Sequence, residues 1–140
     1  MEYTKIIDGE GLIAGRLAST VSKELLMGET IAIVNCEKVI ITGRKENILA
    51  KYQSLVHKGK TTRGPYFPRR SDMLLKRIIR GMLPHKKTKG RDALSRVKCF
   101  ISVPEEFKDQ KFTKFKEATT RKIEDFMTIR ELTKKLGARL

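Results

Sequence analysis

The stretch YTKIIDGEGLIAGRLASTVSKELLMGETIAIV, residues 3–34, decides the fold because it places a helix signal between two strand signals. Residues 3–7 are predicted to form a short strand that ends in a glycine-containing turn. Over residues 12–27 apolar side chains recur at spacings of three and four, the period of an amphipathic helix, and Gly28 can end that helix in a left-handed conformation. Residues 30–34 are apolar on both faces, which is typical of a strand in a parallel sheet.

The following segments continue the alternation of strands and helices. Residues 38–42 either extend the second strand or add another, and residues 45–57 carry a second helical stripe of apolar side chains. Residues 58–70 lack such a stripe and contain two glycines and two prolines. We therefore expect a long ordered loop there.

The second half of the chain begins with a further helix. Ser71 and Asp72 are candidate N-caps for it, and Pro84 is expected to follow its end. A last strand is predicted at residues 97–103 and a short terminal helix at residues 128–136.

Strands separated by helices of ten or more residues predict right-handed crossover connections. The expected fold is therefore an α/β domain of three layers, with a central, mainly parallel sheet of about four strands flanked by helices. We assign residues 1–104 to this domain. Residues 105–140 are expected to form a C-terminal helical extension that packs on the domain or on its neighbours.

Charge is the unusual property of the composition. The 140 residues include 31 Lys or Arg and 16 Asp or Glu, for a formal net charge of +15 at pH 7. Residues 51–100 carry 15 basic and 2 acidic side chains, against 6 and 7 in residues 1–50 and 10 and 7 in residues 101–140. Charge present only for solubility would be spread evenly, so this concentration predicts a polyanionic partner.

The two cysteines and the lengths of the apolar runs indicate the cellular compartment of the protein. Cys36 and Cys99 lie 63 positions apart, which is not the spacing of a metal site or a redox pair. We interpret them as buried thiols in a reducing compartment. The longest apolar run, residues 31–34, is far too short to span a membrane. A cytoplasmic protein without a membrane partner is therefore expected.

The first candidate site is the loop at residues 58–70. Its cations, which suit phosphate groups, are Lys58, Lys60, Arg63, Arg69 and Arg70. Tyr66 and Phe67 are able to stack on an unpaired base or sugar. The alternative is a solvated loop whose two aromatic side chains tuck under the domain. We favour RNA contact, because neighbouring cations without acidic partners repel one another.

The second candidate site is the connection at residues 80–91. Met82 and Leu83 are expected to anchor the end of the preceding helix in the core, and Pro84 fixes the direction in which the chain leaves it. Its basic residues form a cationic turn on this rigid base: Arg80, His85, Lys86, Lys87, Lys89 and Arg91. The alternative is a flexible, exposed basic loop.

A third candidate belongs to a different class of function. Gly9, Gly11 and Gly15 follow the first strand, and Glu37 follows the second, which loosely matches a dinucleotide-binding fingerprint. The alternative function is therefore a small Rossmann-like dinucleotide-binding protein. The match is weak, because Gly15 falls inside the first helical turns and the remaining chain offers no substrate domain.

The sequence contains no familiar catalytic or metal-binding spacing. His57 and His85 lie 28 positions apart, outside the zinc-binding patterns, and no nucleophile elbow occurs. We therefore expect a protein that is not an enzyme and uses no cofactor, metal or small-molecule substrate.

A set of motifs, taken in order, points to a known family. The motifs are Ile7-Asp8-Gly9, Ala14-Gly15-Arg16-Leu17-Ala18, Ile33-Val34-Asn35-Cys36-Glu37-Lys38-Val39 with Thr42-Gly43, and Ile79-Arg80-Gly81-Met82-Leu83-Pro84 with Gly90-Arg91. Together they resemble the L13 family of large-subunit ribosomal proteins over about residues 3–104. Arg63-Gly64-Pro65-Tyr66 and Pro84-His85-Lys86 resemble its archaeal and eukaryotic branch.

The resemblance implies an α/β domain that binds large-subunit rRNA as a structural, early-assembling component beside neighbouring ribosomal proteins. Carried onto this chain, it places RNA at Arg16, at the pair Arg44 and Lys45, at the loop of residues 58–70 and at the turn of residues 80–91. The charge pattern alone predicts a polyanion, and the resemblance identifies that polyanion as rRNA. The family has glycines after its first strand without binding a nucleotide, which weakens the dinucleotide interpretation.

Overall fold

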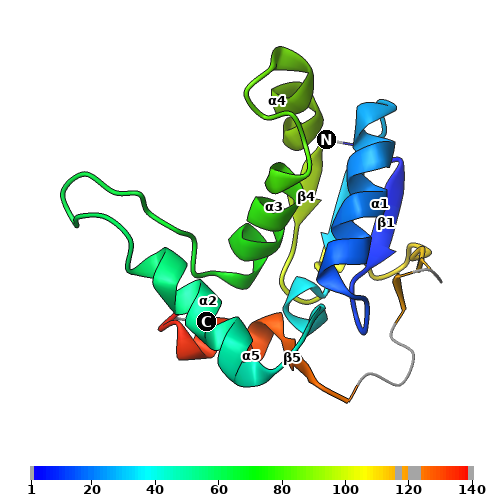
Figure 1. Ribbon diagram of the computed structural model, residues 1–140. Coiled ribbons are helices and arrows are strands. Elements are labelled where there is room, and N and C mark those ends of the chain that lie inside the picture. Colours follow the sequence, from blue (N-terminus) through cyan, green and yellow to red (C-terminus); the bar gives the residue numbers. More distant parts are fainter. Residues whose placement is uncertain (1, 116–117, 120–123, 139–140) are drawn as a thin grey trace.

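The computed structural model describes residues 2–115, 118–119 and 124–138. Its centre is the unit predicted from residues 3–34: strand β1 (Lys5–Asp8), helix α1 (Ala14–Leu26) and strand β2 (Ile31–Val34). Strand β4 (Val97–Cys99) lies on the other side of β2, and the order β1-β2-β4 is parallel throughout. The α/β class and the parallel sheet are thereby confirmed (Figure 1).

The two faces of the parallel sheet are covered differently. One face, with Ile7, Ile31 and Ile33, packs in the main core against the helices. The other, with Ile6, Ala32 and Val34, packs against Phe107 of the 3₁₀ turn η2 (Glu105–Phe107). The rings of Tyr3, Phe100 and Phe107 meet edge to face there, with centroids 5.4 to 6.3 Å apart. The third layer is thus a set of aromatic side chains around a short turn.

The segment at residues 38–42 adds a strand, but outside the main sheet. A 3₁₀ turn, η1 (Cys36–Lys38), redirects the chain after Asn35, whose φ of 54° lies in the left-handed region. Strand β3 (Ile40–Thr42) then pairs antiparallel with β5 (Phe126–Thr128). The parallel sheet therefore has three strands, and β3 and β5 form a separate pair.

Three helices follow β3: α2 (Lys45–Val56), α3 (Ser71–Gly81) and α4 (Thr88–Ser95). The first two match the predicted helices closely. Helix α4 was not predicted: we expected a basic turn that extends to residue 91 and no helix before the last strand. It buries only Gly90 and Ala93, which is too little apolar surface to produce a helical stripe in the sequence.

The predicted N-caps of α3 are wrong. Arg70 holds the N-cap position, and Ser71 is the first helical residue. The Ser71 hydroxyl is buried and lies 3.3 Å from the Thr133 hydroxyl, while an Asp72 carboxylate oxygen accepts a hydrogen bond from the Met73 N–H at 2.9 Å. Neither side chain caps the helix, because Ser71 contacts Thr133 and Asp72 accepts from its neighbour Met73.

The end of α3 is anchored by one residue of the expected pair. Leu83 is 4% exposed and belongs to the main core, whereas Met82 is 45% exposed. The prediction is correct for Leu83 and wrong for Met82. Because α3 ends at Gly81, the chain turns Met82 outward and Leu83 inward.

The C-terminal helix α5 (Ile129–Lys135) confirms the helix predicted at residues 128–136. The Thr128 hydroxyl caps it by accepting a hydrogen bond from the Glu131 N–H at 3.3 Å. Met127, Ile129 and Leu132 are fully buried in the same core as α1 and α3. Within the described residues, no helix has the length and apolar character needed to cross a bilayer.

Candidate nucleic-acid interface

The loop at residues 58–70 leaves the end of α2, extends as an arm away from the helices, and returns to the start of α3 (Figure 1). Backbone contacts order this arm. The Gly64 N–H donates to the Lys60 carbonyl oxygen at 2.8 Å, and a Cβ on Gly59 would lie 2.1 Å from the Gly64 carbonyl oxygen. The arm therefore closes only with glycine at position 59. Its five cations are exposed: Lys58, Lys60, Arg63, Arg69 and Arg70.

The two aromatic side chains of the arm have separate positions. Tyr66 is 72% exposed, and its hydroxyl donates to the Thr61 carbonyl oxygen at 2.7 Å. Phe67 instead packs on the core residue Tyr52, with ring centroids 6.1 Å apart, and the Arg77 guanidinium lies 6.0 Å from its centroid. Tyr66 is thus available to a partner, whereas Phe67 tucks under the domain.

The second basic segment, residues 80–91, is closely packed and hydrogen-bonded within itself. Gly90 in α4 packs so closely on the turn that a Cβ there would lie 2.0 Å from the Pro84 carbonyl oxygen. The Arg91 guanidinium donates to the Lys86 carbonyl oxygen at 3.0 Å. The exposed cations of this segment are Lys86, Lys87, Lys89 and Arg91, whereas Arg80 and His85 are half-buried. Because α4 begins at Thr88, Lys89 and Arg91 are helical rather than part of a turn.

Helix α3 separates the two basic segments. With 11 residues it spans about 16 Å at 1.5 Å per residue. Its cations Lys76, Arg77 and Arg80 are half-buried and lie along the helix between the arm and the second basic segment. Lys76 and Arg77 were not among the residues predicted from the sequence. Met73, Arg77 and Arg80 recur at helical spacing opposite the apolar side of α3, and this spacing could have indicated a second, basic side of the helix.

Arg16 lies apart from both basic segments, on the first turn of α1. It is exposed and lines a hollow of about 510 Å³ together with Lys51 and Tyr52 of α2 and Ile78 of α3. Lys51, which the sequence analysis did not single out, therefore shares a surface with Arg16.

Arg44 and Lys45 have acidic surroundings. Both are exposed, but they share a hollow of about 370 Å³ with Glu46, Glu124 and Asp125. The Lys45 ammonium also lies 3.4 Å from a Glu131 carboxylate oxygen. Carboxylates from α2 and from the C-terminal segment thus lie close to this pair, unlike the surroundings of the two basic segments.

The charge of residues 51–100 has little internal compensation. Among the residues that the structure describes, the ion pair between Arg70 and Asp72, at 3.4 Å, is the only one that involves a cation of this region. Both partners lie within the region, so no described carboxylate of either terminal part pairs with its cations. An exposed pair of this kind contributes at most about 1 kcal/mol to stability.

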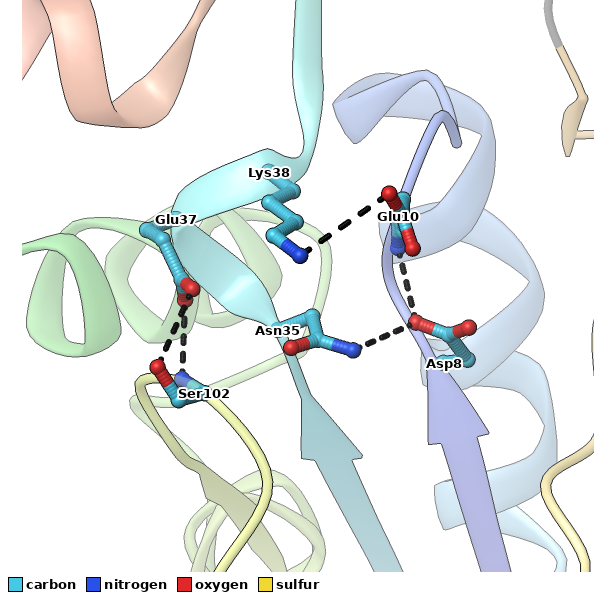
Figure 2. A network of polar contacts seen from close by, with 6 residues as sticks. All are labelled: Asp8, Glu10, Asn35, Glu37, Lys38 and Ser102. Atoms are coloured by element: carbon cyan, nitrogen blue, oxygen red, sulfur yellow. Dashed lines mark hydrogen bonds and ion pairs between the residues drawn. The ribbon is translucent and has the colours of Figure 1, made fainter.

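Two residues of the candidate dinucleotide site, Gly9 and Glu37, are engaged in contacts within the protein. At the carboxyl ends of β1 and β2, the Asn35 amide donates to Asp8 at 3.0 Å, and Glu37 accepts the Ser102 N–H at 3.0 Å (Figure 2). A Cβ on Gly9 would lie 2.8 Å from the Val39 side chain and 3.1 Å from the Val34 carbonyl oxygen. The glycine at this position therefore allows two backbone segments to pack, and Glu37 holds Ser102 rather than facing a ribose.

The two cysteines are buried and free, as the sequence indicates. The Cys36 thiol donates to the Phe100 carbonyl oxygen at 2.9 Å. Burial raises the pKa of the Cys36 thiol well above its usual value and that of Cys99 to about 12. Both thiols are therefore protonated at neutral pH.

Comparison with known proteins identifies the family. Residues 2–106 match the family model described as Ribosomal protein L13. The chain belongs to the ribosomal protein L13 family. The resemblance found in the sequence is thereby confirmed.

The L13 relatives cover nearly the whole chain. A protein of Methanosarcina barkeri and one of Methanocaldococcus jannaschii are each 46% identical, over 137 and 138 residues, and each alignment covers 96% of this chain and 98% of the relative. A protein of Archaeoglobus fulgidus is 42% identical over 137 residues, covering 96% of this chain and 88% of the relative. All three are named "Large ribosomal subunit protein uL13".

Membership of the L13 family confirms that the protein is a ribosomal protein and not an enzyme. The similarity to archaeal relatives agrees with the branch that residues 63–66 and 84–86 indicate. The dinucleotide-binding alternative is not favoured, since the relatives are ribosomal proteins and Glu37, the residue expected to bind a ribose, binds Ser102 instead.

Proposed function

We propose that this protein is a structural constituent of the large subunit of the cytoplasmic ribosome, where it binds and clamps large-subunit rRNA during assembly. Family membership and the names of the relatives support the place in the large subunit. One observation supports RNA clamping most strongly: the cations of the arm and of residues 80–91 lie at the two ends of α3 without carboxylate partners from the rest of the described chain.

The mechanism is charge neutralisation at fixed positions. The arm and the second basic segment, residues 80–91, lie at opposite ends of α3, whose 11 residues rise by about 16 Å. Two RNA segments that would otherwise repel each other are able to approach this surface, and release of their counterions drives binding. Contacts to phosphates position the protein, while RNA shape and a few unstacked bases provide specificity.

The proposed RNA contacts are those predicted from the sequence together with cations of α2 and α3. They are Arg16, Lys51, Lys58, Lys60, Arg63, Tyr66, Arg69, Arg70, Lys76, Arg77, Arg80, His85, Lys86, Lys87, Lys89 and Arg91. We assign Arg44 and Lys45 a weaker role, because acidic side chains surround them. We assign neighbouring ribosomal proteins to the exposed side of β5 and α5, which includes Phe126 at 37% exposure.

Co-sedimentation tests the proposal. Purified protein is mixed with large subunits depleted of their own copy, in moderate salt, and centrifuged through sucrose. The protein should sediment with the subunits and remain there after a salt wash, whereas a nonspecific cationic protein should be washed off. Protein that stays at the top of the gradient would contradict the proposal.

A further inference from the structure

A hollow of about 450 Å³ lies between the arm and α3. Its apolar and aromatic lining consists of Tyr66, Phe67, Pro68, Met73 and Leu94. Three cations of α3 complete it: Lys76, Arg77 and Arg80. The volume falls in the range of about 300 to 1,000 Å³ that is usual for small-ligand sites.

The aromatic walls of the hollow are already in place. The hydrogen bond from Tyr66 to the Thr61 carbonyl oxygen, at 2.7 Å, holds a ring that is 72% exposed. Phe67 rests on Tyr52 of the core. A partner that stacks on Tyr66 therefore loses little side-chain entropy, because the ring is ordered before binding.

The charges at the hollow favour an anionic occupant. Within the described residues no acidic side chain lines it, and the nearby Asp72 pairs with Arg70. Met73, which is 51% exposed, gives the same hollow an apolar surface. The occupant that matches these features has a flat apolar body and negative charge next to it.

We propose that the hollow receives one unpaired base of an RNA strand, which stacks on Tyr66 while its flanking phosphates lie against Lys76, Arg77 and Arg80. This inference rests on the proposed function and adds a binding site for a single base to it. Every base has an aromatic face, so stacking tolerates any sequence. In a regular duplex the bases are paired and stacked inside the helix, so none can enter the hollow.

The test compares two RNA probes. One is a fluorescein-labelled, single-stranded RNA of ten nucleotides, and the other is a labelled RNA duplex of ten base pairs, with binding followed by fluorescence anisotropy over a range of salt concentrations. Tyr66→Ala should weaken binding of the single strand about 5- to 150-fold, the usual range for loss of one base stack. Its affinity for the duplex should be unchanged.

Matched variants separate stacking from other effects. Tyr66→Phe keeps the ring and should bind the single strand much more tightly than Tyr66→Ala. Met73→Glu places a carboxylate in the hollow and should also weaken single-strand binding. Met27→Ala removes a side chain that is 82% exposed at the end of α1 and should change nothing. Circular dichroism verifies that each variant is folded.

The outcomes distinguish this inference from the function on which it rests. Equal affinity of Tyr66→Ala and the unaltered protein for the single strand, with salt dependence intact, would overturn the base site alone. Equal losses for the single strand and the duplex would overturn it as well. A ten-residue polyglutamate peptide that binds with the same dependence on Tyr66 would show that the hollow takes an acidic protein segment. Failure of the unaltered protein to bind either RNA would contradict the proposed function.

Discussion

At the scale of single residues, Gly90 shows how one missing side chain shapes the basic segment of residues 80–91. A Cβ at this position would meet the Pro84 carbonyl group, which is backbone and has little freedom to move aside. We predict that Gly90→Ala lowers the free energy of unfolding by about 1 to 3 kcal/mol, the usual cost of overpacking. Urea denaturation measures the change.

The control for this prediction is Gly81→Ala in α3, where a Cβ would meet no atom within 4 Å. That change should stabilise the protein by about 0.4 to 1 kcal/mol, because alanine restricts the unfolded chain more than glycine does. Similar effects of the two substitutions would show that the contact between Gly90 and Pro84 does not constrain the turn.

Met82 and Leu83 provide a second test at this scale. Leu83→Ala should lower the free energy of unfolding by about 2 to 5 kcal/mol, because it leaves a cavity in the core. Met82→Ala should change it by no more than about 0.5 kcal/mol, as expected for an exposed site. Thermal or urea denaturation of both variants decides the matter, and a large loss for Met82→Ala would contradict the orientation described here.

The Cys99 thiol makes stability depend on alkaline pH. Burial raises its pKa from 9.0 to about 12, so the folded state keeps a proton that the unfolded state loses. The associated stability is complete below pH 9 and falls as the pH rises toward 12, by about 1.4 kcal/mol per pH unit. Between pH 8 and 10 the unaltered protein should therefore lose about 1 kcal/mol more than Cys99→Ala does. Parallel pH profiles from urea denaturation would rule this out.

Neighbouring residues show why sequence alone could not assign every side chain. Met82 and Leu83 are both apolar, and only the position at which α3 ends decides which one is buried. Tyr66 and Phe67 are both aromatic, and Phe67 is drawn inward by its contact with Tyr52. Such choices depend on contacts between distant parts of the chain.

At the scale of elements, residues 80–91 are predicted to contribute a measurable share of RNA binding. Replacing Lys86, Lys87 and Lys89 by Ala should make the slope of log affinity against log salt shallower by about 2 to 3 units, since each lost phosphate contact reduces it by nearly one. The fold should be intact, because all three side chains are exposed. Affinity for an rRNA transcript, measured at several salt concentrations, provides the slope.

The control removes the same amount of charge elsewhere. Lys23, Lys108 and Lys111 are exposed and lie outside the basic segments. Replacing all three by Ala lowers the net charge equally and should leave the slope nearly unchanged. A slope that falls equally in both triple variants would mean that net charge, rather than the turn, determines binding.

Most elements could be predicted from the sequence because the spacing of their apolar side chains is a local property of the chain. The apolar spacing within residues 12–27 indicates α1 without any knowledge of the remaining chain. Helix α4 was missed because contact with the preceding turn, rather than an apolar stripe, stabilises it. The partner of β3 was also unpredictable, since β5 lies more than 80 residues further along the chain.

At the scale of the whole molecule, α1 and α3 pack on one face of the parallel sheet. The two basic segments lie at opposite ends of α3. The concentration of charge in residues 51–100 is visible in the sequence, but its division between an arm and a turn on opposite ends of one helix is not. Sequence analysis likewise did not show that carboxylates of the C-terminal segment surround Arg44 and Lys45. That compensation depends on the pairing of β3 with β5.

The central claim is that most cations of residues 51–100 lack partners within the protein and are neutralised by the phosphates of a folded RNA. It is tested most directly by the salt dependence of binding between the unaltered protein and a large-subunit rRNA transcript. With about eight phosphates contacted, log affinity should fall with log salt at a slope of about −6 to −7. A slope no steeper than about −2, which corresponds to two or three contacts, would contradict the account.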